Sequence, residues 1–405
     1  MIAFKDGDRK MCIKDENKFD FDRIIDRINT SSIKWDLLEN IYGEKDLLPL
    51  WVADMDFPSP KEVTAAITER AKHPIYGYTA ISDDYYNAII SWNKRRYGYE
   101  IEKDWIFHSP GVVPAINWLI QCLTEKGDKI IIQEPVYHPF KHGIEINERI
   151  PVINELSFKD DSYEMNLEEL QGLIDDKTKV LILCNPHNPV GRVWSKSELI
   201  ALGELCLKHG IIVIADEIHG DLIYKNYKHI PFASISEEFS DICITCSAPT
   251  KTFNLAGLQC SNIIIKNPEL RKKLAEYLDK LHLQGPTPLS IVGVQAAYNY
   301  GEPWLEALLS YLEDNVKFTM GFIKENLPSV KVIPPQGTYL LWLDFRGTGL
   351  NREEINERLL KKAKVALNDG YMFGKLGYGF QRMNIACPKT ILKEALTRIT
   401  LAFQE

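Results

Sequence analysis

The chain has 405 residues, of which 45% are hydrophobic and 26% charged, and its formal net charge is −8. This length predicts two domains with a full core in each, and the composition is ordinary for a soluble globular protein. The negative charge argues against nucleic acid or an anionic membrane surface as the main partner. No apolar run approaches the roughly 20 residues needed to span a bilayer, so we expect no membrane partner.

The first stretch of the chain, MIAFKDGDRKMCIKDENK, is polar and lacks an apolar segment of the signal-peptide type. It predicts a loose arm, and we expect a cytoplasmic protein. The eight cysteines are scattered, mostly inside apolar runs. Cys243 and Cys246 form a CxxC motif, but residues i and i+3 of a strand point to opposite faces, so we interpret this pair as core. No second CxxC or histidine cluster completes a zinc site, and we predict no metal.

Short β-branched runs alternate with longer helical patterns along the chain. The predicted helices span residues 60–72, 82–97, 112–125, 196–208, 269–284, 302–326 and 352–366. The predicted strands span residues 129–134, 179–184, 210–217, 241–247 and 261–266. Near-continuous apolar strands separated by helices are typical of a mostly parallel sheet covered on both faces, so we predict an α/β fold.

The pattern changes from about residue 290, where two long helices flank the segment KVIPPQGTYLLWLDF at 331–345. This arrangement predicts a smaller α+β domain packed on the first. We therefore expect three parts: an arm with part of the small domain at 1–48, a large domain at 49–289 and a small C-terminal domain at 290–405.

Polar residues follow four of the strands, at the edge where open α/β sheets bind ligands. Asp216 ends the run GIIVIADE, and Asn188 follows KVLILC in NPHNPVG. Ser109 precedes a helix that begins near Pro114, and Lys251 follows the run DICITCS. Each has a structural alternative when taken alone: a helix cap for Asp216, a turn for Asn188 and a plain helix start after Ser109.

One ligand explains all four strand ends: a pyridine ring with an aldehyde, a hydroxyl and a phosphate, which is pyridoxal 5′-phosphate (PLP). A lysine buried among small and apolar groups has a lowered pKa and can react with the aldehyde. A carboxylate keeps the ring nitrogen protonated, an amide donates to the hydroxyl, and a helix N-terminus binds the phosphate. We expected Asp216 to stay ionised because a fixed cation beside it outweighs the effect of burial.

Six sequence blocks resemble the MalY/PatB-type C–S lyases, or cystathionine β-lyases, of the aminotransferase class I/II superfamily. The blocks are LWVADMDFPSP (50–60), YGY (76–78), NPHNPVGRVW (185–194), ADEIHGDL (215–222), SAPTKTFNLAGLQ (247–259) and FGKLGYGFQRMNIACP (373–388). The resemblance covers nearly the whole chain, from residues 26–36 to residues 381–388. It implies a fold-type I PLP enzyme whose large domain carries the cofactor.

The resemblance also implies the role of each cofactor residue. Lys251 resembles the Schiff-base lysine and catalytic base, Asp216 the partner of the ring nitrogen, and Asn188 the donor to the ring hydroxyl. Tyr137 resembles the aromatic that stacks on the ring, with a core aromatic as the alternative. The implied phosphate ligands are the backbone N–H groups of Val112 and Val113, the hydroxyls of Ser247 or Thr250, and Tyr78 from a neighbouring subunit.

On the substrate side, Arg382 resembles the arginine that pairs with the α-carboxylate, because its planar fork suits a carboxylate. The blocks at 50–60 and 76–78 add Asp54, Met55 and Tyr76 as substrate-binding residues. Because Tyr78 resembles a tyrosine that reaches into the site of the neighbouring subunit, the resemblance implies a homodimer with shared active sites. Apolar and aromatic walls for a thioether side chain are expected from the residues Trp51, Met55, Phe57, Tyr339 and Phe373.

Three positions depart from the common aminotransferase pattern. Gln259 stands where most relatives have a phosphate-binding arginine, and Ala248 where glycine or serine is expected. His219 stands where many aminotransferases have a tyrosine that touches the ring hydroxyl, and it is either a cofactor contact or a packed histidine. All three departures are usual in the C–S lyase branch.

The resemblance implies β-elimination from L-cystathionine or a related S-substituted cysteine, which yields thiol, pyruvate and ammonia. That chemistry belongs to amino-acid metabolism such as methionine biosynthesis. Two alternatives remain open from the sequence: an aminotransferase of an amino acid, and a regulatory protein that retains the PLP fold. The motifs around Lys251 serve elimination and transamination alike.

Overall fold

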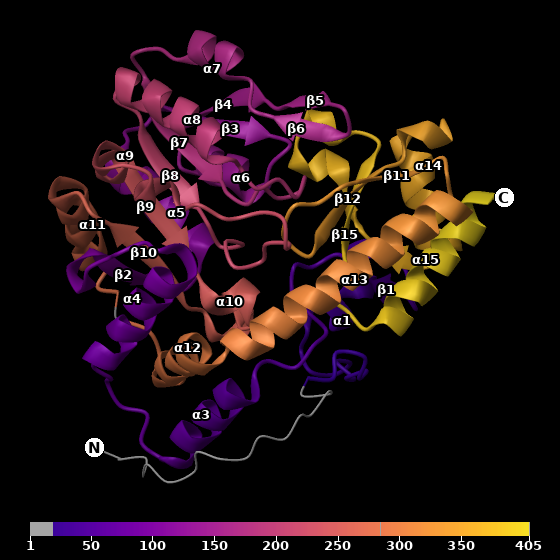
Figure 1. Cartoon of the computed structure of the whole chain (residues 1–405), viewed down its shortest axis with the longest axis horizontal. Coiled ribbons are helices and arrows are strands. Elements are labelled where there is room, and N and C mark those ends of the chain that lie inside the picture. The colour runs from indigo at the N-terminus through magenta and orange to yellow at the C-terminus, as the bar shows by residue number, and fades with distance from the viewer. Residues whose placement is uncertain (1–18, 284, 405) are drawn as a thin grey trace.

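The computed structural model describes residues 19–283 and 285–404, so the predicted arm over the first 18 residues lies outside the described residues. The large domain is built on a seven-stranded sheet in the order β2-β10-β9-β8-β7-β3-β4 (Figure 1). Its strands are β2 (Ile106–Ser109), β3 (Lys129–Glu134), β4 (Ile150–Glu155), β7 (Thr178–Cys184), β8 (Ile212–Asp216), β9 (Cys243–Ser247) and β10 (Ser261–Ile265). Only β10 runs antiparallel to its neighbours, which confirms the mostly parallel sheet.

The central strands are apolar on both faces because helices cover both faces. Alternate residues of each strand pack into two separate apolar clusters. Cys243 belongs to one cluster and Cys246 to the other, and both are buried. The interpretation of this CxxC pair as core is confirmed, since its two thiols point to opposite faces of the sheet.

The helices of the large domain lie in two layers around the sheet (Figure 1). They are α3 (Lys61–Lys72), α4 (Asp83–Tyr97), α5 (Val112–Leu123), α6 (Pro139–Ile146), α7 (Leu167–Leu173), α8 (Lys196–His209), α9 (Glu237–Ile242), α10 (Pro249–Thr252), α11 (Pro268–Lys280) and α12 (Pro288–Tyr300). Helices α5, α6 and α11 contribute to one apolar cluster, and α3, α4, α8 and α12 to the other. Helix α12 packs against α3 and α4, so the expected domain boundary at residue 290 falls inside a helix of the large domain.

The small domain begins after α12 with the long helix α13 (Glu302–Asn326), which runs diagonally across Figure 1. An antiparallel sheet in the order β11-β12-β15-β14 follows. Its strands are β11 (Lys331–Ile333), β12 (Leu340–Asp344), β14 (Asn368–Asp369) and β15 (Phe380–Asn384), and the helices α14 (Arg352–Glu357) and α15 (Lys389–Gln404) accompany them. No helix within residues 19–283 and 285–404 is long and apolar enough to cross a membrane.

The segment before the large domain joins the small domain. It carries the short helices α1 (Ile33–Asp36) and α2 (Leu38–Tyr42) and the strand β1 (Leu48–Pro49). Strand β1 pairs in parallel with β13 (Val365–Ala366). The helix predicted at 352–366 therefore ends early: a π-helical turn at 358–362 follows α14, and Lys364 (φ 54°) turns the chain into β13.

Candidate active site

Asp216 lies at the carboxyl end of the central strand β8, where its neighbours in register are Cys184 of β7 and Cys246 of β9. Its side chain is buried, and Oδ1 accepts a hydrogen bond from the Ile218 N–H at 3.1 Å. Burial raises the pKa of Asp216 from 3.8 to about 7, and the Ile218 N–H and the Lys251 charge offset only part of this effect. The charge of Lys251 alone therefore does not outweigh burial, and the expectation that Asp216 stays ionised beside the cofactor stays a prediction.

Lys251 lies on the single-turn helix α10, which follows β9. Its Nζ donates a hydrogen bond of 2.6 Å to the carbonyl oxygen of Ala53. Burial lowers the pKa of Lys251 to about 8, the Arg382 charge lowers it further, and Asp54 and Asp216 work in the opposite direction. A lysine in this environment is neutral often enough near neutral pH to act as a nucleophile or a base, as its surroundings in the sequence predicted.

Arg382 lies in the middle of β15 and is 4% exposed. All its hydrogen-bond acceptors are neutral: the side-chain oxygens of Asn188 (3.0 Å) and Asn368 (2.6 Å) and the carbonyl of Trp51 (3.1 Å). The guanidinium also lies 4.9 Å from the centre of the Phe373 ring, and Nε has no hydrogen-bond partner. Burial lowers the pKa of Arg382 to about 10. This buried cation thus has no carboxylate partner within residues 19–283 and 285–404.

The segment 51–54 crosses the site and presents its backbone carbonyls to it. The Trp51 carbonyl accepts from Arg382, and the Ala53 carbonyl accepts from both Lys251 and the Tyr339 hydroxyl. The Asn384 amide donates to the carbonyls of Val52 and Asp54. One extended segment therefore ties both domains together at the site.

The N-terminus of α5 is the place at which the sequence predicts the phosphate. Gly111 is its N-cap, no side chain caps it, and no acidic residue lies in its first turn. The N–H groups of Val112 and Val113 at this end are suited to an anion. Ser247 ends β9, and Thr250 lies on the first turn of the Lys251 helix. Gln259 is exposed, in a left-handed conformation (φ 51°).

Aromatic and polar side chains surround these charges. Tyr137 precedes α6, close enough for the charges of Arg382 and Asp216 to act on its hydroxyl. His219 is buried with its ring edge-on to Tyr339, 6.0 Å between centres, and its Nδ1 has no partner. Burial lowers the pKa of His219 to about 3, so the imidazole is neutral.

These residues fit PLP, the cofactor that the resemblance implies. Asp216 is a buried carboxylate with a raised pKa, and a protonated ring nitrogen would supply the positive partner it lacks. The buried oxygen Oδ1 of Asn185 and the Nδ1 of His219 have no hydrogen-bond partner in the described structure. Buried polar atoms without partners are unfavourable unless a ligand satisfies them.

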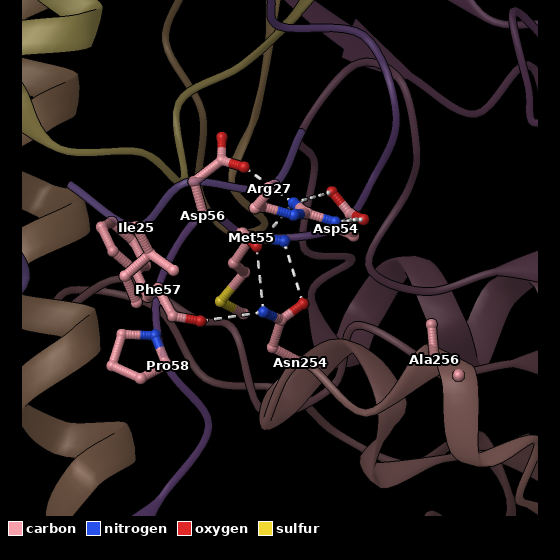
Figure 2. A pocket seen from close by; sticks show the side chains of 10 residues that line it. Ile25, Arg27, Asp54, Met55, Asp56, Phe57, Pro58, Asn254 and Ala256 are labelled. Atoms are coloured by element: carbon pink, nitrogen blue, oxygen red, sulfur yellow. Dashed lines mark hydrogen bonds and ion pairs between the residues drawn. The ribbon is translucent and has the colours of Figure 1, made fainter. Parts of the chain in front are cut away.

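Asp54 and Met55 lie in an environment different from the expected one. Arg27 binds both carboxylate oxygens of Asp54, at 3.1 and 2.7 Å, and also bonds Asp56 at 2.7 Å. Figure 2 shows the Arg27 guanidinium between these carboxylates, at a cavity of about 300 Å³. Met55 is buried, and its backbone is bound by Asn254. The Asp54 carboxylate is thus bound by Arg27 and the Met55 side chain is buried, and the assignment of either residue to the substrate stays a prediction.

Tyr76 and Tyr78 lie on the loop between α3 and α4, outside the group formed by the other predicted residues. Tyr78 is 95% exposed and Tyr76 57% exposed. The Tyr76 hydroxyl donates to the Ala71 carbonyl of the preceding helix, and Arg70 lies over its ring. Within one subunit, therefore, neither tyrosine reaches the site.

Asp221 is a contributor that we did not predict. It accepts hydrogen bonds from Thr252 (2.8 Å), Trp92 (3.1 Å) and Tyr97 (2.5 Å). Because Thr252 directly follows Lys251, this buried carboxylate ties the helix of the lysine to α4. The sequence signal was only an aspartate five residues after Asp216.

Comparisons with known proteins agree with this geometry. The family model described as aminotransferase class I and II matches residues 45–399. Cystathionine beta-lyase PatB of Bacillus subtilis (strain 168) is 44% identical over 94% of this chain and 99% of its own length. A PLP-bound protein of Clostridium difficile 630 is 48% identical, with a TM-score of 0.94, over 95% of this chain and 100% of that chain. Cystalysin from Treponema denticola, whose structure contains PLP, is 37% identical, with a TM-score of 0.93, over 95% of this chain and 99% of that chain.

Proposed function

The chain belongs to the PLP-dependent aminotransferase class I and II family, in the branch of the MalY/PatB-type C–S lyases, and from this premise we propose that it cleaves the C–S bond of S-substituted cysteines. L-cystathionine is the substrate we propose first, since relatives that include PatB and a protein of Corynebacterium glutamicum are named cystathionine β-lyases. The products are a thiol, pyruvate and ammonia.

The observation that carries the proposal is a buried arginine that has no carboxylate partner among the described residues and lies close enough to Lys251 for its charge to lower the pKa of that lysine. Arg382 is held in place by neutral acceptors, so its charge is available to the α-carboxylate of an amino acid. A bidentate arginine–carboxylate pair fixes both the position and the orientation of the substrate.

Each residue then has a task in the reaction. Lys251 would hold PLP covalently, Asp216 would bind the ring nitrogen, and the N-terminus of α5 would bind the phosphate. When bound, PLP supplies an electron sink for the pair released when the Cα–H bond breaks. Lys251, once free, takes the Cα proton on Nζ, and the Ala53 carbonyl, which already accepts from Nζ at 2.6 Å, stabilises the ammonium that results.

The ion pairs of Arg27 favour elimination over transamination of acidic amino acids. Arg27 is held by Asp54 and Asp56, so it is not available to a side-chain carboxylate of the substrate. The walls expected for a thioether are buried: Met55, Phe57, Tyr339 and Phe373. A long, weakly polar side chain is therefore a better match than aspartate or glutamate.

The proposal is tested by incubating the purified PLP-loaded protein with L-cystathionine in the absence of any keto acid. We expect pyruvate, ammonia and free thiol in equal amounts. Product that appears only when a keto acid is added, together with a new amino acid, would identify an aminotransferase instead.

We further propose that the active protein is a homodimer in which Tyr78 binds the phosphate of the neighbouring subunit. Tyr78 is 95% exposed on a loop that also exposes Ile75 (67%), which is unfavourable for a subunit that remains alone. Ile81 of the same loop lies against Gly285, next to the exposed Leu283. This apolar surface is suited to a second copy of the chain.

Shared sites predict complementation between two inactive variants. Lys251→Ala and Tyr78→Phe proteins are mixed and allowed to exchange subunits, and one site of each mixed dimer then has both native groups. We expect partial recovery of elimination. If exchange is confirmed by mass spectrometry, Tyr78→Phe alone is impaired and no activity returns, then Tyr78 does not act across the interface.

A further inference from the structure

Tyr339 lies directly before strand β12 and is fully buried. Its hydroxyl donates a hydrogen bond of 3.0 Å to the Ala53 carbonyl oxygen. The same oxygen accepts the hydrogen bond of 2.6 Å from Lys251 Nζ. Lys251, the base of the proposed reaction, and the Tyr339 phenol therefore donate to the same carbonyl oxygen.

Elimination from a thioether has a second requirement besides removal of the Cα proton. The electron pair of the Cβ–S bond leaves with sulfur, and an alkyl thiolate is basic, with an ordinary pKa of about 8.5 or higher. A buried site excludes the water that would otherwise protonate it. A general acid beside the leaving group accelerates such a step by roughly 10²–10⁴-fold.

We propose that Tyr339 is this acid, and that its hydroxyl passes a proton to the leaving sulfur and recovers one from Lys251. This inference rests on the proposed elimination. The Cα–H bond breaks, its proton moves to Lys251 Nζ, and its electron pair becomes the second bond between Cα and Cβ. The Cβ–S pair stays on sulfur, which takes the Tyr339 proton, and Lys251 returns its extra proton to the phenolate. One proton thus passes from Cα to sulfur, and Lys251 ends neutral.

The electrostatics of the pocket suit this order of events. Burial, and next the charge of Asp54, raise the pKa of Tyr339 above its ordinary value, so the hydroxyl is protonated before the reaction. The ammonium formed on Lys251 then stabilises the phenolate, so the acid becomes effective only after the Cα proton has been removed. His219, whose ring adjoins Tyr339, is a poor alternative because burial lowers its pKa to about 3.

The test compares leaving groups in the PLP-loaded enzyme. Tyr339→Phe removes the hydroxyl, and kcat/KM is measured with S-ethyl-L-cysteine and with 3-chloro-L-alanine, whose chloride needs no proton. We expect a loss of about 100-fold or more with the thioether and less than about 3-fold with the chloride. Equal losses with both substrates, or no loss with either, would overturn the proposal.

A second measurement separates acid catalysis from a positioning role. Exchange of the Cα proton of L-alanine in ²H₂O, followed by NMR, depends on Lys251 but involves no leaving group. Tyr339→Phe should exchange this proton, and bind PLP with an unchanged visible spectrum, as the wild type does. A parallel loss of exchange would show that Tyr339 only positions Lys251 and would refute the acid role.

The matched control is Tyr224→Phe. Tyr224 is also buried, and its hydroxyl donates to the carbonyl of Thr338, the residue before Tyr339, at 2.5 Å. This variant should lose no selectivity between the two substrates. If the wild type releases pyruvate from neither substrate, the proposed function itself fails, an outcome distinct from a Tyr339 variant that loses both activities equally.

Discussion

Two groups of charged side chains, most of them buried, lie side by side in this molecule and are built in opposite ways. The closed cluster consists of Arg27, Lys34, Asp54 and Asp56. Arg27 bonds both carboxylates at 2.7 Å, and the fully buried Lys34 bonds Asp56 at 2.7 Å. Although burial works against it, Asp54 and Asp56 hold the pKa of Arg27 above its ordinary value.

The open cluster consists of Lys251, Asp216 and Arg382. None of the ion pairs found in the described parts of the chain includes any of these three. Their partners are carbonyls, amides and a backbone N–H, and burial moves each pKa toward the neutral form. Paired charges of this kind stabilise a fold or are neutral to it, whereas unpaired buried charges cost stability and serve ligands.

The largest effect is expected from Lys251→Ala in the open cluster. It should lower the elimination rate by about 10⁴-fold, because both the covalent link to PLP and the base are lost. Borohydride reduction followed by mass spectrometry of tryptic peptides measures the link directly. A variant that still carries reduced PLP on another lysine would contradict the role of Lys251.

Lys34→Met should have the next largest effect, on folding and not on chemistry. It leaves Asp56 without its closest ammonium partner in a buried position, and we expect a loss of about 3–5 kcal/mol in the free energy of unfolding. Lys45→Met is the control, since Lys45 is 73% exposed and should change stability by less than about 0.5 kcal/mol. Urea denaturation of the PLP-loaded proteins compares them, and equal midpoints would show that the closed cluster does not hold this segment.

Arg382→Lys tests the other cation of the open cluster. The variant keeps the charge but loses the planar fork. The transition-state stabilisation derived from kcat/KM should therefore fall by about 1.5–3 kcal/mol, with PLP binding preserved. Arg346→Lys, which replaces a half-exposed arginine paired with the buried Asp344, is the matched control. If the variant changes only the thermal stability, Arg382 does not bind the substrate.

The smallest effect is expected from Asp216→Asn, which should stabilise the PLP-free protein. Burial raises the folded-state pKa of Asp216 from 3.8 to about 7, so folding loses stability as the pH rises between these values. Asp216→Asn should therefore stabilise the PLP-free protein by about 2 kcal/mol near pH 8, and by little near pH 4. Urea denaturation of PLP-free protein at both pH values measures this, with the exposed Asp176→Asn as control. A destabilised variant at the higher pH would show that Asp216 has a cation partner of its own.

The fold was predictable where local patterns match the final environment. The β-branched runs became β3, β7, β8, β9 and β10, because central strands are apolar on both faces. Helix α12 was missed because most of its residues are apolar and buried, so it has no polar face to give a helical period. The helix predicted at 352–366 was too long, since pairing of β13 with β1 depends on a segment more than 300 residues away.

The candidate site was predictable where a residue ends a strand. Asp216 and Lys251 stand at the expected edge of the sheet, and the Arg382 fork is free of carboxylates. Sequence spacing could not show that Arg27 binds the Asp54 carboxylate, because both residues lie in loops that only the tertiary fold brings together. The place of the Tyr339 hydroxyl beside Lys251 was equally hidden, since it is set by the Ala53 backbone.

The carbonyls of segment 51–54 have a consequence for how the protein is made. Trp51 meets Arg382, and Val52 meets Asn384, about 330 residues later in the chain. At roughly 5–20 residues per second, a ribosome needs about 15–65 s to supply these partners. During that interval the buried Leu50, whose carbonyl accepts from the Asn384 N–H in the finished fold, is left without this partner. The active site therefore cannot assemble until the last strand emerges, and a chain truncated before β15 lacks Arg382 altogether.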